Sequence, residues 1–129
     1  MISGAICNEE FQFYYGKNNN IIYTGFVNDA EMSALFQNCK AFLFPSLMEG
    51  FGIPPLEALY NGVPIIISDT SSLPEIYEDC AHYIDPMKYD YCLDEILNEQ
   101  VGAPEKILEK FSWKISAQQW YELIRNFAG

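Results

Sequence analysis

The sequence predicts an α/β fold of the Rossmann type, in which helices cover both faces of a parallel sheet. Short apolar, β-branched runs alternate along the chain with segments of helical periodicity. Loops that contain glycine or serine follow several of these runs, and neither a repeat nor a linker divides the 129 residues. We therefore expect one domain over residues 1–129, large enough to bury a core.

The first part of the chain predicts two strands and a helix. Residues 1–5 are expected to end a strand, and residues 21–24 form a β-branched and aromatic run that ends at a glycine. The polar residues 17–20 between them predict a turn. Asn28 or Asp29 is placed to cap a helix. The apolar positions of that helix recur at helical spacing and are Met32, Leu35, Phe36 and Cys39.

The middle of the chain predicts a buried strand over residues 41–44, followed by a loop and a helix that begins near Ile53. Pro54 and Pro55 suit the first helical turn, because the amide hydrogens that they lack have no acceptor inside the helix there. Gly62 is expected to end this helix.

The rest of the chain continues the alternation of strands and helices. Strands are expected over residues 63–67 and 82–85, and helices over 73–79, 89–99, 104–108 and from Ser112 onward. The last helix carries a heavy apolar face made by Trp113, Ala117, Trp120, Ile124 and Phe127. This face is expected to be core, or the surface that meets an absent domain.

Composition excludes several classes of function. Half of the residues are apolar and 16% are aromatic, so the chain is expected to fold rather than to remain disordered. The formal net charge of -11 should repel nucleic acid and anionic membrane surfaces. No segment reaches the apolar length of a membrane span, so we expect no direct membrane insertion and a cytoplasmic location.

The cysteines and the single histidine do not predict a metal site, and no cofactor is expected. Cys7, Cys39, Cys80 and Cys92 lie far apart and include no Cys-x-x-Cys pair. We expect mostly buried, reduced thiols. His82, on a short predicted strand, is expected to be a core or rim residue.

The stretch from Pro45 to Gly62 carries the candidate site. It follows a predicted strand, contains a glycine-bearing loop, and leads into a helix, which is how α/β folds build phosphate sites. Glu49 in the loop and Glu57 in the first helical turn are separated by seven residues. We expect both carboxylates to face the space above the helix N-terminus, where amide donors and hydroxyl acceptors would be combined.

This stretch, Pro-Ser-Leu-Met-Glu-Gly-Phe-Gly-Ile-Pro-Pro-Leu-Glu-Ala-Leu followed by Gly-Val-Pro-Ile-Ile-Ile-Ser, resembles the retaining glycosyltransferases of the GT-B fold, family 4. Further matches are Tyr-Thr-Gly-Phe-Val, Ser-Asp-Thr-Ser-Ser-Leu-Pro-Glu, Ile-Asp-Pro and Phe-Ser-Trp. The resemblance covers about Gly4 to Phe127 and lies within the C-terminal, donor-binding half of such an enzyme. It also implies a helix over residues 7–15.

The resemblance implies a metal-independent transfer of a sugar from a UDP- or GDP-linked donor to an acceptor, with retention of configuration. Glu49 would contact hydroxyls of the donor sugar as the catalytic residue, and Glu57 would accept hydrogen bonds from the ribose hydroxyls. The diphosphate would rest on the glycine loop, formed by Gly50, Phe51, Gly52 and Ile53. The nucleobase of the donor would lie near Phe26, Val27 and Met32.

The chain departs from the family in two respects. The arginine and lysine that clamp the diphosphate in the family belong upstream of residues 1–5, and the acceptor-binding N-terminal domain is missing as well. The chain is therefore expected to be an N-terminally truncated donor domain, inactive by itself. The alternative is a non-catalytic nucleotide-sugar-binding or interaction module that keeps the pocket without the reaction.

Overall fold

The computed structural model describes residues 2, 3, 16 and 18–128, and the chain divides into two compact units, Met1–Asn38 and Cys39–Gly129. In the first unit, β1 (Ile2–Ser3) pairs in parallel with β2 (Tyr23–Gly25), and α2 (Asp29–Asn38) follows. The strand expected at residues 21–24 thus begins two residues later. The helix expected at residues 7–15 lies outside the described residues.

Helix α2 begins with a reciprocal cap that decides between the two candidate capping residues. The Glu31 amide donates to Asn28 Oδ1 at 3.0 Å, and the Asn28 amide donates to Glu31 Oε2 at 2.8 Å. Because this capping box satisfies two amides that the helix itself cannot, Asn28 is the cap.

The second unit is built on a parallel sheet of three strands in the order β3 (Phe42–Phe44), β4 (Ile65–Ser68) and β5 (His82–Ile84). All four residues of β4 are buried, as expected for a central strand with both faces covered. Strand β3 is less buried than predicted, since Leu43 is 43% exposed. Within this sheet β3 pairs only with β4 and forms an edge.

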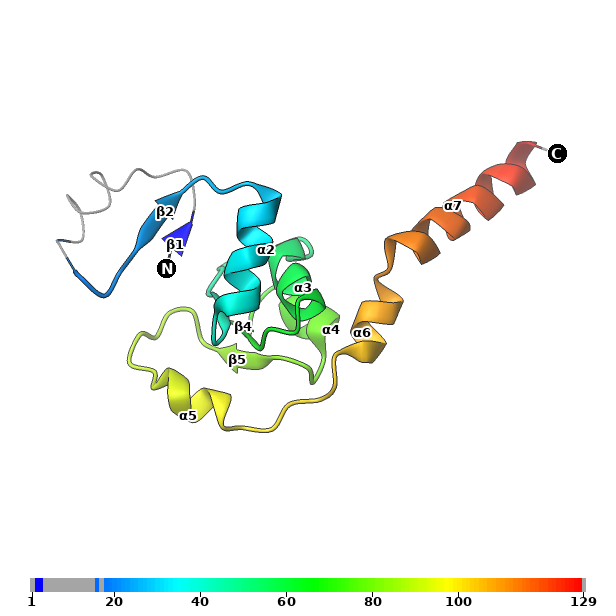
Figure 1. The fold of residues 1–129 in the computed structure, drawn as a ribbon. Helices are drawn as coiled ribbons and strands as arrows, with labels where there is room; N and C mark the ends of the chain where they lie inside the picture. Colours follow the sequence, from blue (N-terminus) through cyan, green and yellow to red (C-terminus); the bar gives the residue numbers. More distant parts are fainter. Residues whose placement is uncertain (1, 4–15, 17, 129) are drawn as a thin grey trace. The chain divides into compact units, whose positions relative to one another are not determined.

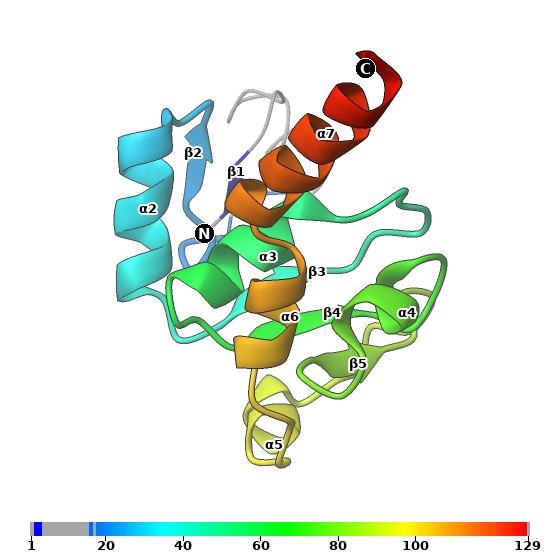
Figure 2. The same cartoon turned by 90° about the vertical axis from the view of Figure 1, so that its right-hand side faces the viewer.

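Helices flank this sheet, and Figures 1 and 2 show α3 and α6 side by side. The helices of this unit are α3 (Ile53–Tyr60), α4 (Leu73–Tyr77), α5 (Leu93–Leu97), α6 (Glu105–Lys110) and α7 (Trp113–Ala128), and α7 extends away from the sheet. Helix α3 carries proline at its first positions as predicted, and Gly62 beyond its C-terminus adopts φ +75°, the left-handed conformation typical of a helix end. The predicted α/β alternation with parallel strands is confirmed.

The predicted helix at residues 89–99 is wrong for its first part, because only Leu93–Leu97 is helical. The hydroxyl of Tyr91 accepts a hydrogen bond from the Asp85 amide at 2.8 Å, which ties this segment to the end of β5. Tyr89 is 96% exposed and contributes nothing to an apolar face. The expectation of mostly buried thiols is also wrong, since Cys80 is buried whereas Cys39 and Cys92 are exposed.

Helix α7 begins at the expected place, and its first turn is closed by a hydrogen bond from the Ser116 amide to the Ser112 carbonyl at 3.0 Å. Its apolar face is not core in this chain: Trp113 and Phe127 are both 85% exposed. The alternative, a surface that meets an absent domain, stays a prediction. None of the helices over the described residues has the length and apolarity needed to cross a membrane.

Candidate functional site

The loop between β3 and α3 is held in place by the serine-rich loop that follows β4. Ser71 Oγ accepts a hydrogen bond from the Glu49 amide at 3.2 Å and donates to the Glu49 carbonyl at 2.7 Å. Ser72 Oγ donates to the same carbonyl at 3.0 Å. Both loops follow neighbouring parallel strands, so they meet at one edge of the sheet. The backbone on both sides of the Glu49 side chain is thereby fixed.

The Glu49 carboxylate is half-buried and accepts a hydrogen bond from Ser46 Oγ at 2.9 Å. This contact spans three residues, so it orients the carboxylate within its own loop. Sequence reasoning placed Glu49 correctly in a loop but did not identify Ser46 or the serines after β4 as its supports. The Pro-Ser that precedes the glutamate was the available signal for the first of these.

Gly52 is required by its backbone conformation and by close packing. Its φ of +81° lies in the left-handed region, and a Cβ there would lie 2.6 Å from Leu73 Cδ2. The Tyr77 hydroxyl donates to the Gly52 carbonyl oxygen, and burial raises the pKa of Tyr77, which keeps this donor protonated. Gly50 differs, since a Cβ there would meet nothing within 4 Å. The loop is therefore locked onto α4 at Gly52 and open at Gly50.

A cavity of about 690 Å³ lies beside α3, a volume typical of small-molecule sites. One wall is α3 together with Phe51 of the preceding loop, and the other is the junction between α6 and α7. Three of the residues predicted from the sequence line it, namely Phe51, Ile53 and Glu57, whereas Glu49 does not. The remaining lining residues are Leu56, Tyr60, Asn61, Leu108, Phe111, Ser112, Trp113, Lys114 and Ser116.

The two walls meet at an aromatic contact that the sequence did not predict. The rings of Phe51 and Phe111 lie edge to face, with centroids 4.9 Å apart and an angle of 88°. Lys110 Nζ lies 5.0 Å from the centroid of the Phe111 ring. Phe51 therefore both packs on Phe111 and lines the cavity.

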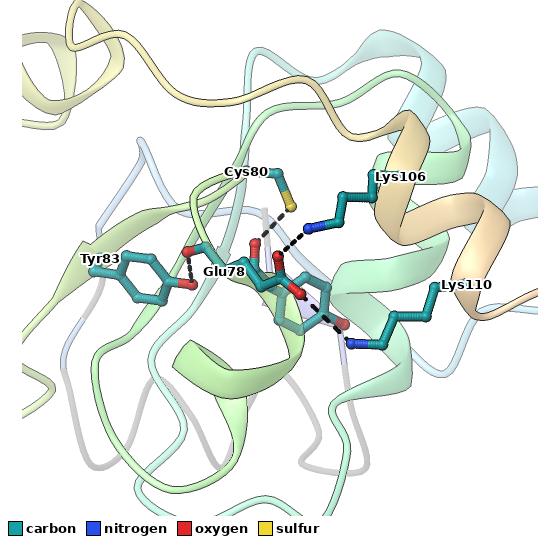
Figure 3. A network of polar contacts seen from close by, with 6 residues as sticks. Glu78, Cys80, Tyr83, Lys106 and Lys110 are labelled. Atoms are coloured by element: carbon teal, nitrogen blue, oxygen red, sulfur yellow. Dashed lines mark hydrogen bonds and ion pairs between the residues drawn. The ribbon is translucent and has the colours of Figure 1, made fainter.

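Helix α6 is clamped to the end of α4 by Glu78, as Figure 3 shows. The Glu78 carboxylate pairs with Lys106 Nζ at 2.9 Å and Lys110 Nζ at 3.5 Å. These hydrogen bonds and charges, chiefly from Lys106, lower the pKa of Glu78. Glu78 holds this position at φ +49°, which is unusual for a residue with a Cβ. We call the set of Glu78, Lys106 and Lys110 the Glu78 clamp.

The backbone at the Glu78 clamp is fixed by further hydrogen bonds (Figure 3). The Tyr83 hydroxyl donates to the Glu78 carbonyl at 2.7 Å, and the Cys80 thiol donates to the Tyr77 carbonyl at 2.8 Å. Burial raises the pKa of Tyr83 to about 12 and that of Cys80 to about 11, so both groups remain protonated donors at neutral pH. The only sequence signal for the clamp was the spacing of Lys106 and Lys110, which places both on one helix face.

The three residues predicted to lie near the nucleobase belong to the first unit, whereas the glutamates belong to the second. These residues are Phe26, Val27 and Met32. Phe26 is 90% exposed, and Val27 and Met32 are half-buried. Their role therefore stays a prediction. His82 is buried, which confirms its expected place in the core. Among the described residues, no three His, Cys, Asp or Glu side chains gather as a metal site.

Comparison with known proteins bears on residues of this site. The family described as "Glycosyl transferases group 1" matches residues 13–86, which include both glutamates and the serine loop. The serotype-specific mannosyltransferase WbdA of Escherichia coli is 49% identical over 63 residues, which is 48% of this chain and 8% of that protein. The O-antigen chain mannosyltransferase B of Escherichia coli is 40% identical over 77 residues, which is 60% of this chain and 20% of that protein.

A longer match is to the MMP alpha-(1->4)-mannosyltransferase of Mycolicibacterium hassiacum, which is 30% identical over 116 residues, covering 78% of this chain and 28% of that protein. The chain thus spans less than a third of each of these three relatives. The family match covers more than half of the chain and includes the loop, helix α3 and the sheet that carries them. The chain belongs to the group 1 glycosyl transferases.

Proposed function

We propose that this chain is the donor-binding part of a retaining glycosyltransferase and that the cavity beside α3 takes part of a nucleotide-diphosphate sugar. The observation that carries the proposal is that Glu57, Phe51 and Ile53 line one cavity of suitable volume next to a rigidly held loop. The family supports a glycosyl-transfer chemistry for the complete enzyme. UDP and GDP are the two donor nucleotides to be tested.

The donor diphosphate would bind at the start of α3. Cleavage of the bond between sugar and diphosphate leaves negative charge on the phosphate, which a catalyst must stabilise. Amides in the first turn of a helix have no acceptor inside it, and the helix dipole favours an anion there. In the first turn of α3, Ile53 carries an amide hydrogen whereas Pro54 and Pro55 do not, and the amides of Phe51 and Gly52 in the preceding loop would add to it. Gly50 leaves open space beside them. This chemistry requires no metal ion.

The two glutamates would bind hydroxyl groups on either side of the diphosphate. Glu57 is exposed on the cavity wall and would accept hydrogen bonds from the ribose hydroxyls. Glu49, with its backbone fixed by Ser71 and its carboxylate oriented by Ser46, would contact hydroxyls of the transferred sugar. The base would contact Phe26, Val27 and Met32. Because the relatives named above are mannosyltransferases, we propose mannose as the first donor sugar to test.

Calorimetric titration with GDP, UDP, ADP, GDP-mannose and UDP-glucose tests this function. We expect one nucleotide to bind, and Glu57→Gln to weaken it by about one to two powers of ten, since a hydrogen bond to a charged group contributes roughly 1.5–3 kcal/mol. Glu75→Gln is the matched control, because Glu75 is an exposed acid in the first turn of α4 and does not line the cavity. The proposal fails if no nucleotide raises the melting temperature at millimolar concentration.

A binding module without catalysis is the second candidate. It is favoured by the position of Glu49, which does not line the cavity that Glu57 lines. An assay that follows the release of GDP or UDP from the sugar nucleotide over time distinguishes the two candidate functions. We expect the isolated chain to bind the donor and to release nucleotide no faster than the Glu49→Gln variant does.

A further inference from the structure

We propose that Lys114 supplies the cation that pairs with the diphosphate of a bound nucleotide sugar. This inference rests on the function proposed above and adds a residue from the C-terminal part of the chain. A nucleoside diphosphate brings two or more negative charges, whereas the chain carries a net charge of -11 and places a carboxylate on the cavity wall. A positive side chain at the cavity would offset part of this repulsion.

The ion pairs of the described residues leave few cations available for this task. Lys40 pairs with Asp94, and Lys88 pairs with Asp85 at 3.6 Å. Both lysines of the Glu78 clamp are engaged as well. Among the six basic residues that the structure describes, Lys114 and Arg125 remain without an acidic partner in the described part of the chain.

Of the two residues, Lys114 rather than Arg125 is placed at the cavity. Lys114 lies in the first turn of α7 and lines the same cavity as Phe51, Ile53 and Glu57. Arg125 lies eleven residues further along α7, which is about 16 Å along a helix axis, and does not line the cavity. Among the described lining residues, Glu57 and Lys114 are the charged ones. A ligand with adjacent hydroxyl and phosphate groups matches this pair in chemistry.

The wall that carries Lys114 is attached to the core at two points. The Glu78 clamp holds α6, and the edge-to-face contact of Phe111 with Phe51 holds the residue at the end of that helix. Phe111 itself leaves the helical conformation, at φ -106° and ψ 40°, and α7 starts two residues later. Lys114 is thus presented across the cavity from α3 by a junction whose near end is anchored.

Lysine suits this role because its ammonium group is a compact charge on a flexible four-carbon stem. It can follow a phosphate as the ligand settles, whereas the helix amides at the start of α3 are fixed in place. A contact of this kind between solvent-exposed charges is screened by salt. Affinity for the diphosphate should therefore fall with ionic strength, and Lys114 should account for much of that fall.

The test compares Lys114→Met, Lys114→Arg and the control Arg125→Met by calorimetric titration. The ligands are GDP and UDP together with guanosine and uridine, which lack the diphosphate. We expect Lys114→Met to weaken the binding diphosphate by about tenfold, as one charged contact implies, and to leave the parent nucleoside unchanged. Lys114→Arg should restore most of the affinity, and Arg125→Met should leave it unchanged. Between about 0.05 M and 0.5 M salt, affinity should fall less steeply in Lys114→Met.

The outcomes distinguish this inference from the proposed function. If a nucleotide binds and Glu57→Gln weakens it while Lys114→Met does not, the role of Lys114 is wrong and the donor site stands. If Lys114→Met weakens nucleoside and diphosphate equally, Lys114 shapes the pocket without pairing to phosphate, and the inference is overturned. If no nucleotide binds any form of the chain, both fail. Lys114 is exposed, and the melting temperature of each variant checks that it folds.

Discussion

The two walls of the cavity are built in different ways. The α3 wall rests on the core: Ala58 and Leu59 on its inner side are buried, and the helix packs against the fully buried strand β4. The α6–α7 wall buries one aliphatic side chain, Ile107, and depends otherwise on the Glu78 clamp and the Phe51–Phe111 contact. Glu57 lies on the first wall, and Lys114, which has no acidic partner among the described residues, lies on the second.

This difference indicates which wall is fixed and which can adjust. Burial of apolar side chains contributes about 1.5–3 kcal/mol for each large residue, whereas ion pairs at a surface contribute much less. Positions on the first wall are therefore set by folding itself. The second wall should respond to pH and salt.

The largest expected effect is at the support of the first wall. Leu73 in α4 is fully buried and lies against Gly52 of the glutamate loop. Leu73→Ala should lower the free energy of unfolding by about 2–5 kcal/mol, because it removes buried methyl groups and leaves a cavity. Urea titration followed by circular dichroism measures this. A loss below about 1 kcal/mol would mean that this wall is no more rigidly built than the other.

Gly52→Ala should come next, at about 2–4 kcal/mol. The new Cβ meets Leu73 Cδ2 at 2.6 Å, and alanine is strained at φ +81°. Gly50→Ala is the matched control in the same loop, since it meets nothing within 4 Å and should change stability little. The double variant Gly52→Ala, Leu73→Ala should lose less than the sum of the two, because the missing leucine makes room for the Cβ. Full additivity would show that the contact is not the cause.

The first wall was largely predictable from the sequence because its signals are local. Pro54 and Pro55 can occupy only the first turn of a helix, and Gly62 tolerates the left-handed conformation that ends it, so both bounds of α3 were anticipated. A strand was expected over residues 63–67 from its β-branched residues, and β4 spans Ile65–Ser68. For the same reason, both glutamates were placed correctly in the loop and the helix.

The second wall could not be predicted, because its contacts join residues that are distant in sequence. Glu78 and Lys106 are 28 residues apart, and nothing near either residue specifies the other as its partner. The helix predicted at residues 89–99 was too long for a more local reason: the Asp85 amide donates to the Tyr91 hydroxyl six residues later, and only Leu93–Leu97 is helical. The cavity, which needs both walls, was therefore predicted only on its α3 side.

A smaller effect is expected at the Glu78 clamp. Glu78→Gln removes the negative charge while it keeps the unfavourable φ of +49°, whereas Glu78→Gly removes both. Glu78→Gly should therefore melt at a higher temperature than Glu78→Gln, which thermal denaturation at pH 7 measures. Equal melting temperatures would show that the backbone at residue 78 is not strained.

The same clamp predicts a pH dependence with a definite sign. The pKa of Glu78 is lowered in the folded chain by Lys106 and Lys110. Its stabilising contribution is thus fully present above the unfolded pKa of about 4.3 and is lost as the pH falls through the lower folded value. Hydrogen exchange of the α6 amides should accelerate, relative to that of β4, as acid is added below about pH 4.3. In Glu78→Gln this relative acceleration should disappear. If it persists, other carboxylates hold α6.

The smallest effect is expected at the far end of the second wall, on α7. Trp120 is 64% exposed, and no residue of α7 whose side chain is described is buried. Trp120→Ala should therefore change the free energy of unfolding by less than about 0.5 kcal/mol, whereas a tryptophan in a core would lose about 3–5 kcal/mol. Urea titration alongside Leu73→Ala makes the comparison within one chain. A loss comparable to that of Leu73→Ala would place α7 against the core and remove the distinction between the two walls.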